Sequence, residues 1–260
     1  MTGLDPVVRL EDVHLSFKGV RAIEGVSFEV HPGELFAIIG PNGAGKTSTF
    51  NVLSGVYRPQ QGRVELLGEN ILGRKPYDIA ALGLARTFQN IALFEHLTVL
   101  DNLMLGRHLH IDYGSAAAFV WLGRARKQEI AHRRFVEEII DFLEIEQWRK
   151  QPVGLLPYGI QKRVELGRAL AMEPRLLLLD EPVAGMNLEE TEDTARYIVD
   201  IRDELDIPIV MVEHDMGLVM DLADRVMVMD FGVPICTGTP DEVQEHPEVV
   251  RAYLGEEVAS

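Results

Sequence analysis

The sequence predicts an α/β fold with a parallel sheet, and three features of the chain support this. Strand patterns open the chain, strand and helix patterns alternate from residue 175 to residue 229, and residues 97–170 are mainly helical in pattern. Alternation of strands and helices is typical of a parallel sheet covered by helices. We therefore expect an antiparallel β subdomain at the start, a parallel α/β core, and a helical insertion over residues 90–170.

The first strands are predicted by an apolar residue at every second position. Val13, Leu15 and Phe17 alternate with polar residues, and the segment 26–30 repeats this pattern. A period of two indicates half-buried antiparallel strands. Residues 35–39 are apolar without interruption, which is expected of a strand covered on both faces.

Later elements follow from periodicity and from helix-capping residues. Residues 46–54 look helical and end at Gly55, residues 130–142 form an approximately amphipathic helix, and Thr239 with Glu242 forms a capping box. Three further apolar runs are candidates for buried strands: residues 176–179, 209–212 and 226–229.

Composition narrows the class of protein. The chain has 260 residues, 47% of them hydrophobic, and a formal net charge of −16, which disfavours binding to a nucleic-acid backbone. A basic cluster over residues 124–134 is interpreted as a solvated helix face. Its one cysteine, Cys236, allows no internal disulfide, and no apolar run reaches the roughly 18 residues of a membrane span. Any work at a membrane would therefore need a partner.

A glycine-rich loop between the apolar run 35–39 and the predicted helix carries the main chemical signal. It matches the P-loop pattern G-x-x-x-x-G-K-[ST] in full. Backbone N–H groups of such a loop bind triphosphate oxygens, the lysine adds a positive charge, and the threonine hydroxyl binds Mg²⁺. The residues are Gly40, Pro41, Asn42, Gly43, Ala44, Gly45, Lys46 and Thr47, with Ser48 following.

Two carboxylates follow the apolar run 176–179. Asp180 would hold Mg²⁺ through water, and Glu181 would act as the general base or orient the attacking water. We expect the strand that ends at Asp180 to lie next to the strand that precedes the P-loop.

The order of motifs resembles the ABC ATPase family over nearly the whole chain. The resemblance places Phe17 against adenine, Gln89 in a hinge loop and at the metal, and His214 as the switch residue that senses the γ-phosphate. It also identifies a signature segment at Leu156, Pro157, Tyr158, Gly159 and Ile160, and a dimer loop at Ala184, Gly185 and Asn187.

The resemblance implies a single ABC ATPase domain over residues 7–255, with a P-loop NTPase core. Its catalytic core would comprise 7–90 and 172–255, and its helical (signature) subdomain 91–171, with an insertion at 107–135. Two copies, or this chain and a paralogue, would stack head to tail, so that ATP and Mg²⁺ on one P-loop meet the other copy's signature segment. Transmembrane permease subunits would be direct partners, and an extracytoplasmic solute-binding protein would be an indirect partner. The chain would lie at the cytoplasmic face of the cell membrane.

The signature segment departs from the family pattern. Pro157 stands where the family has serine, Tyr158 where it has a second glycine, and Ile160 where it has a polar residue. The serine hydroxyl contact to the γ-phosphate is thus absent, while Gly159 keeps backbone contact open.

Several segments resemble the larger ATPase subunit of branched-chain amino acid importers, namely 85–90, 156–159, 213–216 and 251–255. Related importers of urea or other small solutes remain an alternative. A soluble ABC ATPase, a small-molecule kinase and a non-hydrolysing cassette are less well matched. The apolar segment 116–122 either packs within the insertion or faces a permease.

Overall fold

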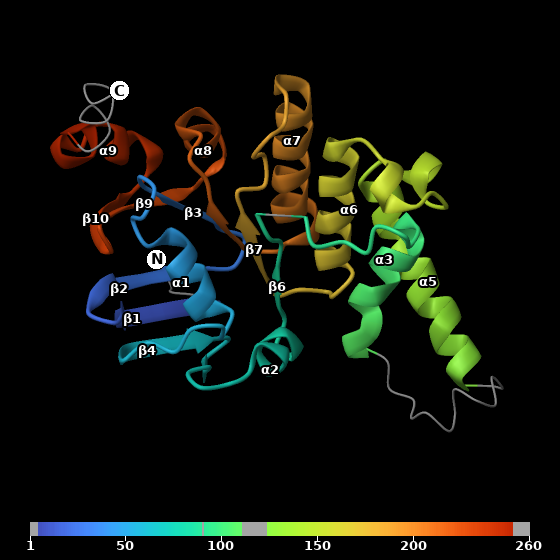
Figure 1. Cartoon of the computed structure of the whole chain (residues 1–260), viewed down its shortest axis with the longest axis horizontal. Helices are drawn as coiled ribbons and strands as arrows, with labels where there is room; N and C mark the ends of the chain where they lie inside the picture. The colour runs from blue at the N-terminus through green and yellow to red at the C-terminus, as the bar shows by residue number, and fades with distance from the viewer. Residues whose placement is uncertain (1–4, 90, 111–123, 252–260) are drawn as a thin grey trace. The chain divides into compact units, whose positions relative to one another are not determined.

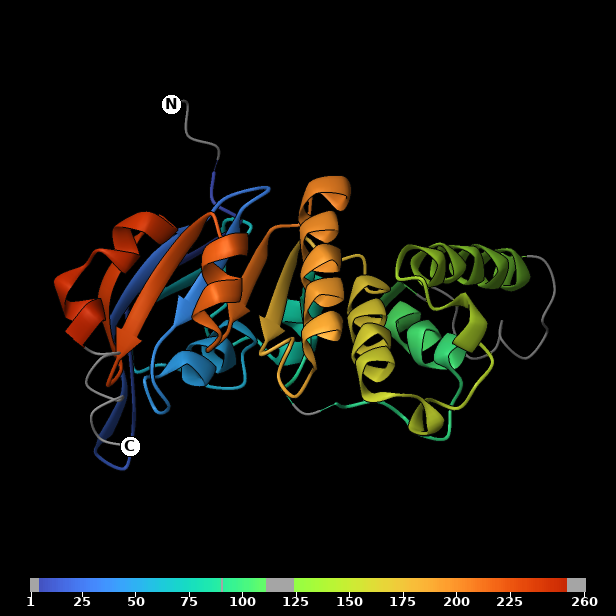
Figure 2. The same ribbon diagram turned by 90° about the horizontal axis from the view of Figure 1, so that it is seen from above.

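The computed structural model describes residues 5–89, 91–110 and 124–251. Within it the chain divides into two compact units (Figures 1 and 2). The first comprises residues up to Arg86, Arg175–Pro182 and the part from Ala195 onward; the second comprises Thr87–Pro174 and Val183–Thr194. The segment predicted to be helical, 91–171, lies within the second unit. The predictions that concern residues 90, 116–122 and 252–255 fall outside the described residues.

A six-stranded sheet forms the centre of the first unit, in the order β10-β9-β3-β8-β7-β6. Strands β9, β3, β8, β7 and β6 are mutually parallel, and β10 pairs antiparallel with β9. The strands are β3 (Leu35–Ile39), β6 (Leu84–Arg86), β7 (Leu176–Asp180), β8 (Ile209–Val212), β9 (Arg225–Asp230) and β10 (Val233–Gly238). The predicted parallel core is confirmed, and β3, β7 and β8 are buried along their whole length.

The expected place of β7 beside β3 is wrong, because β8 lies between them. With a spacing of about 4.8 Å between neighbouring strands, the carboxyl ends of β3 and β7 lie about 10 Å apart across the sheet. The order of strands depends on crossover connections, which the pattern of a single strand does not report.

A four-stranded antiparallel sheet, in the order β2-β1-β4-β5, belongs to the same unit. Its strands are β1 (Val8–Phe17), β2 (Val20–Val30), β4 (Gln61–Leu66) and β5 (Glu69–Asn70). The predicted alternation is confirmed at Val13, Leu15, Val26 and Val30, which are buried, but not at Phe17, which is 42% exposed at the end of β1.

Helices complete the first unit. Phe50 and Leu53 of α1 share one apolar core with both sheets, and α8 and α9 pack against β3 and β9 respectively (Figure 1). The helices are α1 (Lys46–Leu53), α2 (Pro76–Ala81), α8 (Met216–Leu222) and α9 (Pro240–Gln244). The capping box of Thr239 and Glu242 is present at the start of α9. Helix α7 (Leu188–Leu205) begins in the second unit and ends in the first.

The second unit is helical in its described part. Helix α3 packs against both α5 and α6, and buried Val99, Leu103, Val136, Ile140 and Val164 belong to these three helices. The elements are α3 (Val99–Gly106), η1 (Arg107–His110), α5 (Arg124–Phe142), η2 (Glu146–Trp148), η3 (Val153–Leu155) and α6 (Tyr158–Leu170). Across the described ranges, no helix combines the length and the apolar composition that a bilayer crossing requires.

Candidate active site

The loop between β3 and α1 folds closely against its neighbours. Gly40 has a φ of +150°, and a Cβ atom there would lie 2.1 Å from the carbonyl oxygen of Met229. No other residue fits such an approach, because real Cβ atoms do not come that near to backbone. The first glycine of the P-loop pattern is thus required by the packing of the loop itself.

Lys46 is buried at the first position of α1. Its Nζ donates hydrogen bonds to the carbonyl oxygens of Gly40, at 2.5 Å, and Pro41, at 3.1 Å, so that the ammonium group lies within the curve of the loop. Helix α1 begins at Gly45 without a side-chain cap and without an acidic residue in its first turn. A helix start of this kind, with a lysine beside it, favours an anion such as phosphate.

A pocket of ≈ 250 Å³ opens over this loop. It is lined by Val20, Arg21, Ala22, Asn42, Gly43, Ala44, Gly45, Lys46, Thr47, Ser48 and Glu181. The structure therefore brings six of the eight P-loop residues together with the predicted base.

Asp180 ends β7 and pairs with Arg86 at the end of the neighbouring strand β6. Arg86 Nη2 lies 2.7 Å from Asp180 Oδ2, and the two side chains are 7% and 5% exposed. Arg86 Nη1 also donates to Asn51 Oδ1 at 2.8 Å and to Ser54 Oγ at 3.0 Å. Because Asn51 and Ser54 lie at the end of α1, Arg86 ties the Asp180 carboxylate to the helix that starts at the P-loop.

Glu181 has a φ of +49°, a left-handed conformation that is uncommon for a residue with a side chain. Such strain is concentrated at functional positions. His214 follows β8, and its Nδ1 lies 4.0 Å from Glu181 Oε2 and 3.6 Å from Glu213 Oε2. The imidazole is 62% exposed, and His214 is not among the residues that line the pocket.

Phe17 lies at the end of β1 and is 42% exposed. Its ring meets the ring of Tyr57 edge to face, with centroids 4.9 Å apart. Phe17 is not among the residues that line the pocket, which on this side is lined by Val20, Arg21 and Ala22. Tyr57 was missed by the sequence analysis, because no motif marks it.

The predicted signature segment and dimer loop meet each other in the second unit. The Tyr158 hydroxyl donates to the Ala184 carbonyl oxygen at 3.1 Å. A Cβ atom at Gly159 would lie 2.5 Å from Glu190 Oε1, so the acidic side chain packs directly on this glycine. Pro157 is the N-cap of α6, with no side-chain cap at that helix start. Gln89 also belongs to this unit and is exposed.

Three charged residues around these motifs were missed as candidates for the site. They are Arg86, Lys162 and Glu165. Lys162 and Glu165 are 5% and 2% exposed, and burial raises the pKa of the Glu165 carboxyl while Lys162 opposes that rise. Lys162 and Glu165 could have been found from the sequence, because a charged residue at a helix position that periodicity assigns to the core indicates a buried polar contact.

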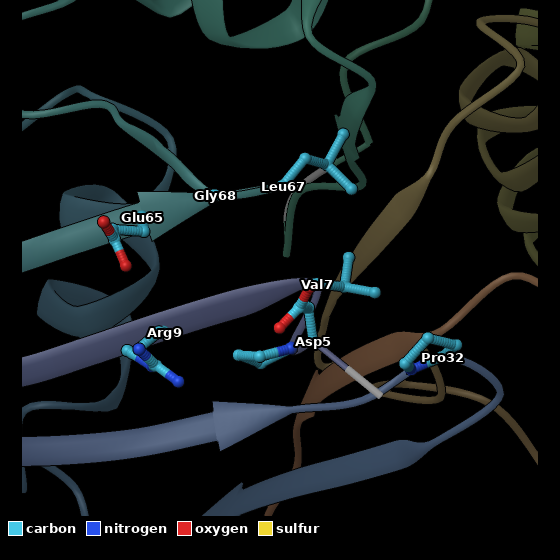
Figure 3. A pocket seen from close by; sticks show the side chains of 8 residues that line it. Asp5, Val7, Arg9, Pro32, Glu65, Leu67 and Gly68 are labelled. Carbon is cyan, nitrogen blue, oxygen red and sulfur yellow. The ribbon is translucent and has the colours of Figure 1, made fainter. Parts of the chain in front are cut away.

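A larger hollow, of ≈ 490 Å³, lies among the strands of the antiparallel sheet (Figure 3). Its wall includes the carboxylates Asp5 and Glu65, together with Arg9, Val7 and Leu67. Carboxylates repel phosphate, and this hollow has no glycine-rich loop at a helix start. It is therefore a poorer candidate for a phosphate ligand than the smaller pocket.

Comparison with known protein families agrees with this geometry. The ABC transporter family matches residues 23–184, and the family described as branched-chain amino acid ATP-binding cassette transporter matches residues 233–259. A high-affinity branched-chain amino acid transport ATP-binding protein, BraF of Pseudomonas aeruginosa, is 36% identical over 96% of this chain and 98% of its own length. The protein LivG of Escherichia coli, described in the same words, is 34% identical over the same shares of both chains.

Solved structures lead to the same family. The ADP conformation of MJ1267, an ATP-binding cassette of an ABC transporter, is 28% identical and matches with a TM-score of 0.84 over 97% of this chain and 100% of that one. A dimeric cassette, MJ0796, bound to ADP and phosphate, shares the fold with a TM-score of 0.76 at 21% identity, over 90% of this chain and 98% of that one. This chain belongs to the ABC transporter family and is one of its ATP-binding, ATP-hydrolysing cassettes.

Proposed function

We propose that this chain hydrolyses ATP to power the import of branched-chain amino acids through a membrane permease. The observation that carries the proposal is the pocket over the P-loop, in which Lys46 and Thr47 share one wall with Glu181. Relatives such as BraF and LivG, which match almost end to end, provide the cargo class.

Nucleotide binding is assigned to the P-loop. Backbone N–H groups of residues 42–48, at the start of α1, would bind the phosphates. Lys46 would exchange its hydrogen bonds to Gly40 and Pro41 for bonds to the β- and γ-phosphates, because charged oxygens are stronger acceptors than carbonyls. Phe17 and Tyr57, with their rings in contact, would offer an aromatic surface near the base.

Hydrolysis is assigned to Glu181 and His214. Glu181 would orient the attacking water and accept its proton. His214 would bind the γ-phosphate and fix the position of Glu181, whose carboxylate lies 4.0 Å from the imidazole.

The oxygen donors beside the P-loop fit Mg²⁺. Among the described residues, no three histidine, cysteine, aspartate or glutamate side chains form a ready metal site, and Mg²⁺ typically takes one or two protein oxygens, waters and phosphates. Thr47 and Asp180 would hold the ion, with Gln89 from the second unit as a further ligand. The ion would neutralise charge on the transferred phosphate.

The signature segment and dimer loop are proposed to act on a second cassette. Two cassettes stacked head to tail would place the start of α6, at Tyr158 and Gly159, against the nucleotide of the partner. Ala184, Gly185 and Asn187 would cross the interface. The partner is a second copy or a paralogue, and the pair would lie on the cytoplasmic face of the membrane, below permeases that receive solute from a binding protein.

The proposed domain boundaries differ from the two units at residues 87–90, 172–174 and 183–194, which the second unit includes. A nucleotide-binding core would comprise residues 7–90 and 172–255, and a helical signature part residues 91–171, including the insertion at 107–135. The second unit also includes residues 183–194, which carry the dimer loop.

Uptake by intact cells tests the cargo. Cells that lack this chain should lose uptake of radiolabelled leucine, isoleucine and valine and keep uptake of urea and sulfate. Wild-type protein should restore leucine uptake and the Lys46→Ala variant should not. Loss of urea uptake with normal leucine uptake would refute the cargo assignment while leaving the ATPase assignment intact.

A further inference from the structure

Helix α6 carries a pair of opposite charges in the interior of the second unit. Lys162 and Glu165 lie one helical turn apart, with Nζ and Oε2 separated by 3.8 Å, and are only 5% and 2% exposed. Burial of such a pair is costly, and apolar residues of similar volume are often as stable or more so. The raised pKa of Glu165, caused by burial, reflects that cost. A requirement other than stability is therefore needed to explain the pair.

Both side chains bind the backbone on either side of Gln89. Lys162 Nζ donates to the carbonyl oxygens of Gln89, at 3.0 Å, and Phe88, at 3.4 Å. Glu165 Oε1 accepts from the backbone N–H groups of Phe88 and Ala92, each at 3.4 Å. Residues 88, 89 and 92 belong to no helix or strand, so α6 supplies hydrogen bonds that regular structure does not.

A third side chain extends this set of contacts. Arg168, one turn beyond Glu165, donates from Nη1 to the carbonyl oxygen of Ala92. The loop is thus held from one helix at residues 88, 89 and 92. Apolar side chains cannot donate to a carbonyl or accept from an N–H, which explains why charged residues occupy these positions.

We propose that Lys162 and Glu165 are positioning residues that fix the backbone around Gln89 to α6, so that Gln89 moves with the helix that begins at the signature segment. Displacement of Tyr158 or Gly159 by a partner's nucleotide would then be transmitted to Gln89 along one rigid helix. This inference rests on the proposed function in one respect, namely the role of Gln89 at the nucleotide.

A purely structural ion pair is the competing explanation, and the same helix offers a matched control. Arg163, next to Lys162, pairs with Asp193, which also lies in the second unit. Asp193→Asn removes an ion pair of α6 and leaves Lys162, Glu165 and Arg168 unchanged. Any effect that comes only from weakening α6 should appear in this control.

Hydrogen exchange on the full chain measures the contact directly. Glu165→Met keeps the length of the side chain and removes its acceptor, so the amides of Phe88 and Ala92 should exchange about tenfold faster, as expected for loss of one buried hydrogen bond. Glu165→Gln keeps an acceptor and should retain most of the protection. Asp193→Asn should leave this segment unchanged. Unchanged exchange in Glu165→Met, or equal acceleration in the control, would overturn the proposal.

Coupling in the assembled transporter measures the consequence. Glu165→Met should bind fluorescent ATP with an affinity within about twofold of wild type, because the P-loop lies in the other unit, while solute moved per ATP hydrolysed falls. In a Gln89→Ala background the same substitution should cause no further fall. A further fall would show that Glu165 acts by another route. The proposed function is tested separately, because hydrolysis that survives Lys46→Ala would refute it whatever the exchange result.

Discussion

Replacing Arg86 by methionine is expected to destabilise the chain strongly. Arg86 and Asp180 are 7% and 5% exposed, and their charged atoms lie 2.7 Å apart. Methionine fills similar space but leaves the Asp180 carboxylate buried without the guanidinium. Breaking a buried pair from one side costs about 3–5 kcal/mol. Each kcal/mol lowers the melting temperature of a domain of 150–250 residues by about 2–4 °C, so a fall of about 6–20 °C is expected.

Thermal melts without nucleotide measure this loss, and Arg225→Met is the control. Arg225 also pairs with a glutamate in the first unit, Glu34, at 3.3 Å; the Arg225 side chain is 34% exposed and that of Glu34 is 10% exposed. Water reaches the guanidinium of this pair, so its loss should cost less than the loss of Arg86 from the more deeply buried pair. Adding Asp180→Asn to Arg86→Met should recover part of the stability, because the buried carboxylate charge is removed. The reasoning fails if Arg86→Met and Arg225→Met have the same melting temperature, or if the double variant is no more stable than Arg86→Met alone.

Four further predictions concern the nucleotide site and α6. Glu181→Gln should bind ATP and lose about 10²–10⁴-fold in turnover, leaving a nucleotide-bound dimer on size-exclusion chromatography; turnover near the wild-type rate would remove Glu181 as the base. Lys46→Ala should weaken binding of fluorescent ATP itself by about tenfold or more, and an unchanged affinity would contradict the assigned phosphate contact. Tyr158→Phe removes only the hydrogen bond to Ala184 and should cost about 0.5–1.5 kcal/mol in urea unfolding; no change would mean that water replaces the bond. Because burial raises the folded-state pKa of Glu165 above its ordinary 4.5, the stability linked to its protonation is complete below that pH and is lost as pH rises through the raised pKa. Glu165→Gln should lack this decline in melts from pH 4.5 upward, and parallel curves for the two proteins would contradict the shift.

Short-range patterns in the sequence predicted elements well, because their cause is local. Val13 and Leu15 of β1 are both buried, as alternation requires. The capping box of α9 joins Thr239 to Glu242, only three residues further along the chain. The P-loop lies between β3 and α1 as its pattern predicted, although the contact that requires Gly40 is with Met229, far away in the sequence.

Long-range relations were not predictable from the same patterns. The position of β8 between β3 and β7 depends on how the crossover connections are arranged. Apolar runs of similar length do not indicate the order of the strands in the sheet. The contact of Glu165 with Phe88 joins residues 77 apart in sequence. From the sequence alone, a polar residue in a helix such as Glu165 is predicted to face solvent, because the distant segment that covers it is not known.

The structure at the start of α6 explains why proline and tyrosine can stand at positions 157 and 158 of the signature segment. The φ of Pro157 is −53°, an angle that proline adopts without strain, and α6 begins at the next residue. A serine there would cap the helix start with its own hydroxyl and compete for the first amides. With proline in that place, no side chain caps α6, and its amides remain suited to an anion. The hydroxyl of Tyr158 donates to the carbonyl oxygen of Ala184, and this bond links the predicted signature segment to the predicted dimer loop. Recognition of a partner's nucleotide would then depend on backbone N–H groups held in place by that link, and the loss of the serine hydroxyl need not weaken it.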